Sequence, residues 1–304
     1  MKILFKLYTE LLPVLAFIPA GYFFKKKFSV NAEYISFPLI KILMPVLVFF
    51  NMLDAESEKL FILPFFTLLL ALAMVPVANL THKRIGQDFN PMLLKSSFSF
   101  FNIAFFGIPA VTALFGEDKV STLICIYLGS ALYGDTIGYF QVARTKYDTS
   151  KALKEVAKIP FLYVFVAGII CKSLDMETPE FLEGPLGVIS LTVSCAGMLI
   201  VGFQLADVSL AKISIAYYLK LIGVRTIAAI LILGALMAAE FFAFESLEKE
   251  DYQMLFLVSL FPVATNVTVF ASFLESEQEK ASLIVVISAL VSLVLVSVAA
   301  FFLM

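Results

Sequence analysis

Two stretches decide how this sequence can fold: SSFSFFNIAFFGIPAVTALFG at residues 96–116 and LFLVSLFPVATNVTVFASFLE at residues 255–275. Both are apolar and long enough to cross a hydrocarbon core of ~30 Å, yet both carry a proline in their interior. Proline removes a backbone donor and clashes with the preceding turn, so we expect the helices to be kinked or broken at Pro109 and at Pro262. Irregular backbone at membrane depth persists only where protein or a water-filled cavity satisfies its polar groups. The two stretches therefore predict a buried polar site beside two interrupted helices.

The composition of the whole chain indicates a membrane protein. It has 304 residues, of which 61% are hydrophobic and 15% are charged, and its mean hydropathy is +0.97. A soluble domain carries about 25% charged residues, so the soluble class is excluded. The opening apolar run could be taken for a signal peptide, but Lys25, Lys26 and Lys27 follow it and no small-residue cleavage site is present. We expect a retained first helix, and no disulfide framework because the three cysteines fall in apolar segments.

Windows of apolar density predict an all-α polytopic membrane protein with about ten transmembrane helices. Their expected bounds are 6–24, 35–53, 60–80, 92–115, 119–142, 159–174, 185–206, 214–238, 252–273 and 280–303. A short basic cytoplasmic linker at 143–158 separates a first repeat at 1–142 from a second at 159–304. Because each half holds an odd number of spans, the second half inserts upside down relative to the first. This is the inverted repeat that recurs in secondary transporters.

The charges of the loops predict the orientation. If the amino terminus is outside, Lys and Arg concentrate in the inner loops, above all at 25–27 and 144–158. The acidic loops at 54–58, 175–183 and 245–251 then fall outside. We expect a multi-pass protein of the cell membrane with both termini outside.

The two interruptions also predict a ligand. The second half of a broken helix begins with unpaired N–H groups and a partial positive charge. Neither stretch has Lys or Arg at its interruption, so helix N-termini and the amides of Asn102 and Asn266 are the expected carboxylate-binding groups. The predicted substrate-binding residues are Asn102, Gly107, Pro109, Pro262, Thr265, Asn266 and Thr268. The alternative is that the asparagines only link helices and the prolines only kink them.

Asp135 is the candidate for ion coupling, because a carboxylate inside a span commonly carries a proton or binds a cation. Its alternatives are a structural partner for Arg225 or Lys220, or a group solvated near the inner face. We expect Arg225 and Lys41 to pair or to snorkel rather than to bind substrate. Asn51 either faces the cavity or has a plain helix-end role.

Several segments resemble one known family over essentially the whole chain. They are LLPVLAFIPAGYFFKKKFSVNAEYISFPLIKILMPVLVFFNML (11–53), FNIAFFGIPAVTALFG (101–116), KIPFLYVFVAGII (158–170), CAGMLIVGFQLAD (195–207) and FPVATNVTVFA (261–271). They resemble the auxin efflux carrier family, in particular its prokaryotic members. The strongest likeness is the order of two motifs, an Asn followed by Gly-x-Pro in the fourth helix and a proline and asparagine in the ninth.

The resemblance implies a fold of ten helices in which the fourth and ninth cross beside the substrate. It implies transport of carboxylates: auxin in plants, and dicarboxylates such as malate or malonate in some bacterial relatives. It also implies a homodimer, in which a transport domain moves like an elevator against a scaffold. Two departures argue against plant-style auxin specificity. Phe101 stands where plant proteins have proline, and the basic stretch replaces their long central loop.

We therefore predict a secondary transporter, an efflux carrier or permease of a small organic anion that acts by alternating access. The alternatives are an anion channel and a non-transporting membrane sensor. An intramembrane enzyme is not expected, because aspartyl proteolysis needs a second acid and Asp207 lies at a predicted helix end. No cofactor or metal is expected either, since His82 is the only histidine and no GxxxxGK[ST] motif is present. The expected partners are the anion, the bilayer and either a proton or no coupling ion, rather than sodium or nucleic acid.

Overall fold

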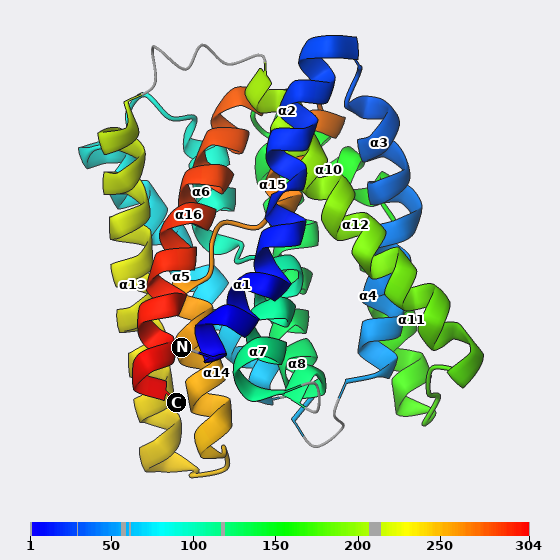
Figure 1. The fold of residues 1–304 in the computed structure, drawn as a ribbon, viewed down its shortest axis with the longest axis vertical. Helices are drawn as coiled ribbons and strands as arrows, with labels where there is room; N and C mark the ends of the chain where they lie inside the picture. Colours follow the sequence, from blue (N-terminus) through cyan, green and yellow to red (C-terminus); the bar gives the residue numbers. More distant parts are fainter. Residues whose placement is uncertain are drawn as a thin grey trace.

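The computed structural model describes residues 2–28, 30–55, 59–60, 62–116, 119–206 and 214–303. Within these ranges the chain is helical, apart from its loops and one isolated antiparallel bridge between Phe101 and Val263. Most helices run along the long axis of the molecule, and the two chain ends lie near each other in its lower half (Figure 1). Asp207, the second acid considered above, lies outside the described residues.

The helical segments follow each other in two halves, with π-helical turns written η. The first half contains α1 (Lys2–Leu15), α2 (Phe17–Phe28), α3 (Glu33–Pro38), η1 (Leu39–Leu43), α4 (Met44–Leu53), α5 (Ile62–Arg84), α6 (Pro91–Ser99), η2 (Ile103–Gly107), α7 (Ile108–Phe115), α8 (Val120–Leu132), η4 (Tyr133–Gly138) and α9 (Tyr139–Ala143). The second half contains α10 (Thr149–Lys158), α11 (Phe161–Ser173), α12 (Glu180–Ala206), α13 (Ile215–Ala243), α14 (Lys249–Leu260), α15 (Asn266–Phe273) and α16 (Gln278–Leu303).

Several of these helices are long and apolar enough to span a membrane. In the described part of the chain there are seven: Leu4–Phe28, Glu33–Leu53, Ile62–Arg84, Val120–Ala143, Glu180–Ala206, Ile215–Ala243 and Gln278–Leu303. An eighth results if α10 and α11, which meet at an angle of 46°, form one broken span. Each covers a ~30 Å hydrocarbon core. The prediction of a polytopic, all-helical membrane protein is therefore confirmed.

The two stretches with interior prolines are both interrupted, but only one breaks at its proline. The second stretch divides into α14 and α15 around Pro262, as predicted. The first divides between α6 and η2, at residues 100–102, and Pro109 lies beyond the break in the first turn of α7. The expectation for Pro109 is therefore wrong. A proline in a first turn needs no N–H donor and fits the helical φ angle, so it interrupts nothing.

Local sequence explains where α6 begins and how α10 forms. Asn90 caps α6, because its side-chain oxygen accepts hydrogen bonds from the N–H groups of Met92 and Leu93, and Pro91 occupies the first helical position. Asp148 caps α10 by accepting from Lys151 N at 2.8 Å. The basic stretch predicted to be a linker thus holds a short helix.

Glycines allow α2 and α12 to pack with their backbones in contact. A Cβ atom added to Gly202 would lie 2.0 Å from the carbonyl oxygen of Ile18, and one added to Gly21 would lie 2.3 Å from that of Leu199. Such close approach between helices is typical of membrane interiors, where small residues replace the hydrophobic effect as the source of association. The α2–α12 spacing therefore depends on these two residues.

Ion pairs join loops at the helix ends. At one end, Lys59 Nζ lies 3.0 Å from Asp251 Oδ1 and Lys119 Nζ lies 3.1 Å from Glu250 Oε2. The hydrogen bond to Glu250 raises the pKa of Lys119, which lies in a loop. The ion pair between Lys119 and Glu250 thereby joins the first turns of α8 and α14. Both turns lie at the end of the molecule that the charges of the loops predict to face outside.

Candidate functional site

The two breaks cross and pair with each other through their backbones. Asn102 N donates to the carbonyl oxygen of Pro262 at 2.9 Å, and Ala264 N donates to that of Phe100 at 3.0 Å. Phe101 and Val263 form the bridge between these two hydrogen bonds. The interrupted helices therefore meet as a short antiparallel pair deep in the protein, where each satisfies backbone groups of the other.

Side chains complete the hydrogen bonding of the crossing. The side-chain oxygen of Asn102 accepts from Phe105 N at 3.2 Å and so caps the second half of its helix, while its amide donates to Thr265 Oγ1 at 2.9 Å. Val263 N donates to Ser288 Oγ of α16 at 3.0 Å. Asn102 thus acts as a helix cap and as a link between the two breaks.

Arg225 of α13 binds the carbonyl groups of both interrupted helices and is almost wholly buried. Its guanidinium donates to Ser97 O at 3.1 Å and Phe261 O at 2.9 Å, with longer contacts to Phe100 O at 3.4 Å and Pro262 O at 3.5 Å. In the described part of the chain it forms no ion pair with a carboxylate. The expectation that Arg225 pairs or snorkels is therefore wrong, whereas Lys41 reaches the carbonyl oxygen of Lys158 at 2.8 Å near a helix end.

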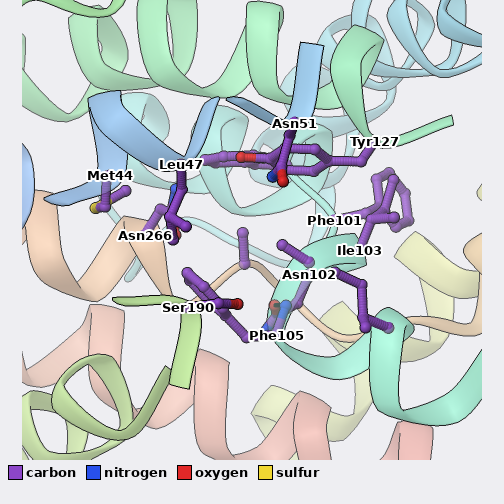
Figure 2. Close-up of a pocket in the computed structure, with 14 residues that line it drawn as sticks. Met44, Leu47, Asn51, Phe101, Asn102, Ile103, Phe105, Tyr127, Ser190 and Asn266 are labelled. Atoms are coloured by element: carbon purple, nitrogen blue, oxygen red, sulfur yellow. Dashed lines mark hydrogen bonds between the residues drawn. The ribbon is translucent and has the colours of Figure 1, made fainter. Parts of the chain in front are cut away.

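A narrow cavity opens beside the crossing, with room in this conformation for about one water molecule between the side chains. Figure 2 shows Asn51, Asn102, Ser190 and Asn266 around it, on four different segments. The lining residues are Met44, Leu47, Asn51, Phe100, Phe101, Asn102, Ile103, Ala104, Phe105, Ile108, Tyr127, Ser190, Ala264 and Asn266. These residues come from α4, α8, α12 and the crossing. None of these residues is charged, so any ligand is met by amides, hydroxyls, backbone and apolar groups.

Only part of the predicted substrate-binding set reaches this cavity. Asn102 and Asn266 line it. Gly107 and Pro109 do not, and Gly107 instead packs against the ring of Phe261, which a Cβ atom there would approach to 2.6 Å. Gly107 and Pro109 therefore contribute to helix packing next to the crossing and do not contact the cavity.

The other three predicted residues also lie beside the cavity rather than in its lining. Pro262 supplies the carbonyl oxygen that accepts from Asn102 N, and Thr265 supplies the hydroxyl that accepts from the Asn102 amide. Thr268 is buried, its Oγ1 has no hydrogen-bond partner in the described part of the chain, and its carbonyl oxygen accepts from Gln204. Pro262 and Thr265 therefore hold Asn102 in place by hydrogen bonds and do not contact the cavity themselves.

Asp135 is fully buried and contacts a residue of the cavity lining. Its Oδ1 accepts from Asn266 Nδ2 at 3.0 Å, while its Oδ2 is buried without a hydrogen-bond partner among the described residues. It pairs with neither Arg225 nor Lys220, and burial excludes the alternative that it is solvated. One side chain, Asn266, thus connects an intramembrane acid to the cavity.

Sequence reasoning missed four contributors to the site. Arg225 was recognised only as a charge within a span, although a buried charge there is expected to be functional. Asn51 was left open between the cavity and a helix-end role, and it lines the cavity. Tyr127 and Ser190 line it as well, but nothing in their sequence surroundings distinguishes them from ordinary helix residues.

A second and much larger hollow, of about 380 Å³, lies between α4, α5, α8 and α11. Its lining includes Phe65, Leu68 and Leu128 and is largely apolar, with Lys172 and Asp175 among its few polar residues. Lys172 already donates to the carbonyl oxygen of Leu53, so a small carboxylate would lose its hydration there for few hydrogen-bond donors. The smaller cavity is therefore the better candidate site despite its size.

Thr265→Val is expected to lower the free energy of unfolding by about 1–3 kcal/mol, because it leaves the buried Asn102 amide without its acceptor. Thr268→Val is the matched control, since it removes a hydroxyl that has no partner among the described residues. The measurement is thermal unfolding in detergent, followed by circular dichroism. Equal midpoints for the two variants would show that the Asn102–Thr265 hydrogen bond does not stabilise the crossing.

Comparison with known proteins does not assign the chain to a family. The sequence matches no protein-family model and no curated protein at a significant level.

Proposed function

We propose that this protein is a secondary transporter of a small organic anion, a carboxylate, which it binds at the crossing of the two interrupted helices and moves by alternating access. The observation that carries the proposal is the backbone pairing of the two breaks next to a polar cavity. Paired discontinuous helices at membrane depth are typical of substrate sites in secondary transporters.

The preference for an anion follows from the helix ends. Ile103–Phe115 and α15 begin at the crossing, so the positive ends of their dipoles lie beside the cavity. The first N–H groups of Ile103 and Val267 already donate to backbone carbonyls, so the helix ends contribute mainly their dipoles. The amides of Asn102 and Asn266 each donate once within the crossing and keep a second N–H, which together with the amide of Asn51 is offered to a carboxylate without a fixed ion pair. An anion held only by dipoles is released more readily than one held by Arg or Lys, which suits turnover.

The proposed architecture is a ten-span inverted repeat. It counts the seven continuous spans, the bent α10–α11 pair and the two interrupted stretches. An even number of crossings is consistent with chain ends that lie on the same side of the molecule (Figure 1). In this proposal both termini are outside the cell membrane, the protein resembles prokaryotic auxin efflux carriers such as malate or malonate permeases, and it forms a homodimer.

The proposed alternating access is a movement of the crossing relative to α4 and α12, which contribute Asn51 and Ser190 to the cavity lining. Such a movement would carry the bound anion without separating it from Asn102 and Asn266. The test is counterflow of radiolabelled malonate in proteoliposomes. Unlabelled malonate inside the vesicles accelerates uptake by a carrier, whereas a channel shows no such acceleration.

Asp135 is the proposed proton-binding group. An ionised Asp135 places a negative charge one side chain away from the anion, so proton binding and anion binding favour each other. Asp135→Asn mimics the protonated form. It is expected to bind the anion equally well at acidic and alkaline pH, and its flux is expected to be unaffected by an imposed pH gradient. The measurement is malonate uptake with and without that gradient.

Asp175→Asn is the control for this experiment. Asp175 is exposed in a loop and has a φ of 55°, a conformation that asparagine adopts readily. It should keep the pH dependence of the wild type. If Asp135→Asn also keeps that dependence, Asp135 has no part in coupling and the transport is passive or coupled elsewhere.

A further inference from the structure

We propose that Arg225 gives the cavity its anion preference by neutralising the negative ends of the two interrupted helices. This inference rests on the proposed function only in taking the ligand to be an anion. Arg225 is then a specificity-determining residue that acts through the crossing and does not touch the ligand.

The carbonyl groups that Arg225 binds lie at one kind of helix end. Helix α6 ends at Ser99 and α14 ends at Leu260, so Ser97, Phe100 and Phe261 belong to their last turns or caps. The last carbonyls of a helix lack intrahelical donors and carry about half a negative charge. Two such ends meet at the crossing, where together they oppose an anion about as strongly as one carboxylate would.

The positive ends of the second halves meet at the same place. Without compensation, the two negative ends would cancel the two positive ends, and the crossing would have little net preference for an anion. Arg225 changes this balance because a guanidinium stays protonated in proteins and here binds both C-terminal ends at once. When Asp135 is protonated, the positive ends of Ile103–Phe115 and α15 then remain uncompensated beside the cavity.

The surroundings of Arg225 fit this function better than a structural ion pair. No carboxylate in the described ranges pairs with it, so its charge is not neutralised by an acid. Its carbon Cζ lies 3.9 Å from the centre of the Phe101 ring, and Phe101 also lines the cavity. The charge is therefore separated from the cavity by a single aromatic ring, which stabilises a cation on its face. The planar fork of Arg reaches several carbonyls, which a lysine cannot do in the same way.

The electrostatic potential of the cavity can be measured without knowing the substrate. In a chain whose native cysteines Cys125, Cys171 and Cys195 are replaced by alanine, Ser190→Cys places one thiol in the cavity lining. The detergent-solubilised protein is treated with anionic sulfonatoethyl or cationic trimethylammonium-ethyl methanethiosulfonate. The ratio of the two modification rates, divided by the same ratio for free 2-mercaptoethanol, reports the sign of the local potential.

With Arg225 present, this normalised ratio is expected to exceed one. Arg225→Met should lower it at least about tenfold, since a unit charge about 10 Å away at an effective dielectric constant of about 20 changes local ion concentrations by that factor. Arg225→Lys keeps the charge and should stay within about threefold of the parent. A merely structural role predicts lower thermal stability for both variants and no difference in ratio between them.

Two outcomes overturn the inference: a normalised ratio of one or less in the parent, or an equal ratio in the parent and in Arg225→Met. If Arg225→Met does not fold, Arg225→Gln is measured in its place. A normalised ratio of one or less in the parent overturns the inference whether or not either variant folds. The result is independent of transport. If the wild type shows no carboxylate flux but the normalised ratio falls strongly in Arg225→Met, the proposed function is rejected and this inference stands. If the wild type shows normal flux but the ratio is the same in Arg225→Met as in the parent, the inference is rejected and the proposed function stands.

Discussion

The double variant Asn102→Ala/Asn266→Ala is expected to reduce carboxylate flux in proteoliposomes to the level of empty liposomes, while the protein still inserts and purifies. Each single variant is expected to weaken substrate binding. These two asparagines are the residues of the crossing that both line the cavity and carry hydrogen-bond donors on their side chains. Removing both leaves a carboxylate with the helix dipoles, the amide of Asn51 and the hydroxyl of Ser190, in a cavity whose other lining groups are mainly apolar.

The two substitutions act in different ways. Asn102→Ala also removes a helix cap, which costs about 1 kcal/mol, and leaves Thr265 without its donor. Asn266→Ala removes the donor to Asp135, so it should change the pH dependence as well as the affinity. Comparing the pH profiles of the two single variants separates these effects.

Asn79→Ala is the control, because Asn79 is an exposed asparagine on α5, away from the crossing. It should transport as the wild type does. Flux in the double variant that equals flux in Asn79→Ala would mean that the asparagines serve only to link helices, and that the cavity is not the substrate site.

Gly202→Ala is expected to produce a large loss of stability. The added methyl group would lie 2.0 Å from the carbonyl oxygen of Ile18, a backbone atom that cannot turn away. Helices α2 and α12 must then separate, and overpacking of this kind costs about 1–3 kcal/mol, with the upper part of the range expected here. Because α12 also carries Ser190, the cavity wall should move with it.

Gly223→Ala is the matched control, since a Cβ atom there meets nothing within 4 Å. In the interior of α13 alanine is favoured over glycine by about 0.5–1 kcal/mol, so this variant should be slightly more stable than the wild type. The chain has no tryptophan, so unfolding is best followed by circular dichroism at increasing temperature. Similar midpoints for the two variants would show that the α2–α12 contact is not tightly packed.

The sequence was sufficient to predict the class of the protein and which two stretches are interrupted. Composition and apolar windows predicted a polytopic helical membrane protein, because spans of this length are required by the bilayer itself. The interruption at Pro262 was also predictable, since a proline in a helix interior removes a hydrogen bond. The break before Asn102 was placed too late, because the sequence does not reveal that Pro109 begins a new helix.

Other features depend on tertiary contacts that no local pattern encodes. The pairing of Asn102 N with Pro262 O joins residues far apart in the chain, as does the binding of both breaks by Arg225. An isolated arginine in an apolar segment has several equally reasonable partners, and only the packing of α13 against the crossing selects backbone carbonyls. The same holds for Asp135. The sequence indicated Asn266 as a substrate-binding residue, but only the structure shows that it donates a hydrogen bond to Asp135.

The most direct test of the central claim is the current from wild-type proteoliposomes on a solid-supported membrane. The vesicles are challenged with mono- and dicarboxylates under neutral, pH-gradient and sodium-gradient conditions, with isotope exchange as the readout for electroneutral transport. The account predicts a saturable response to at least one carboxylate, lost in the double asparagine variant and enhanced by a pH gradient but not by a sodium gradient. Neither current nor exchange for any carboxylate would contradict it, and would leave a helical membrane protein with another function.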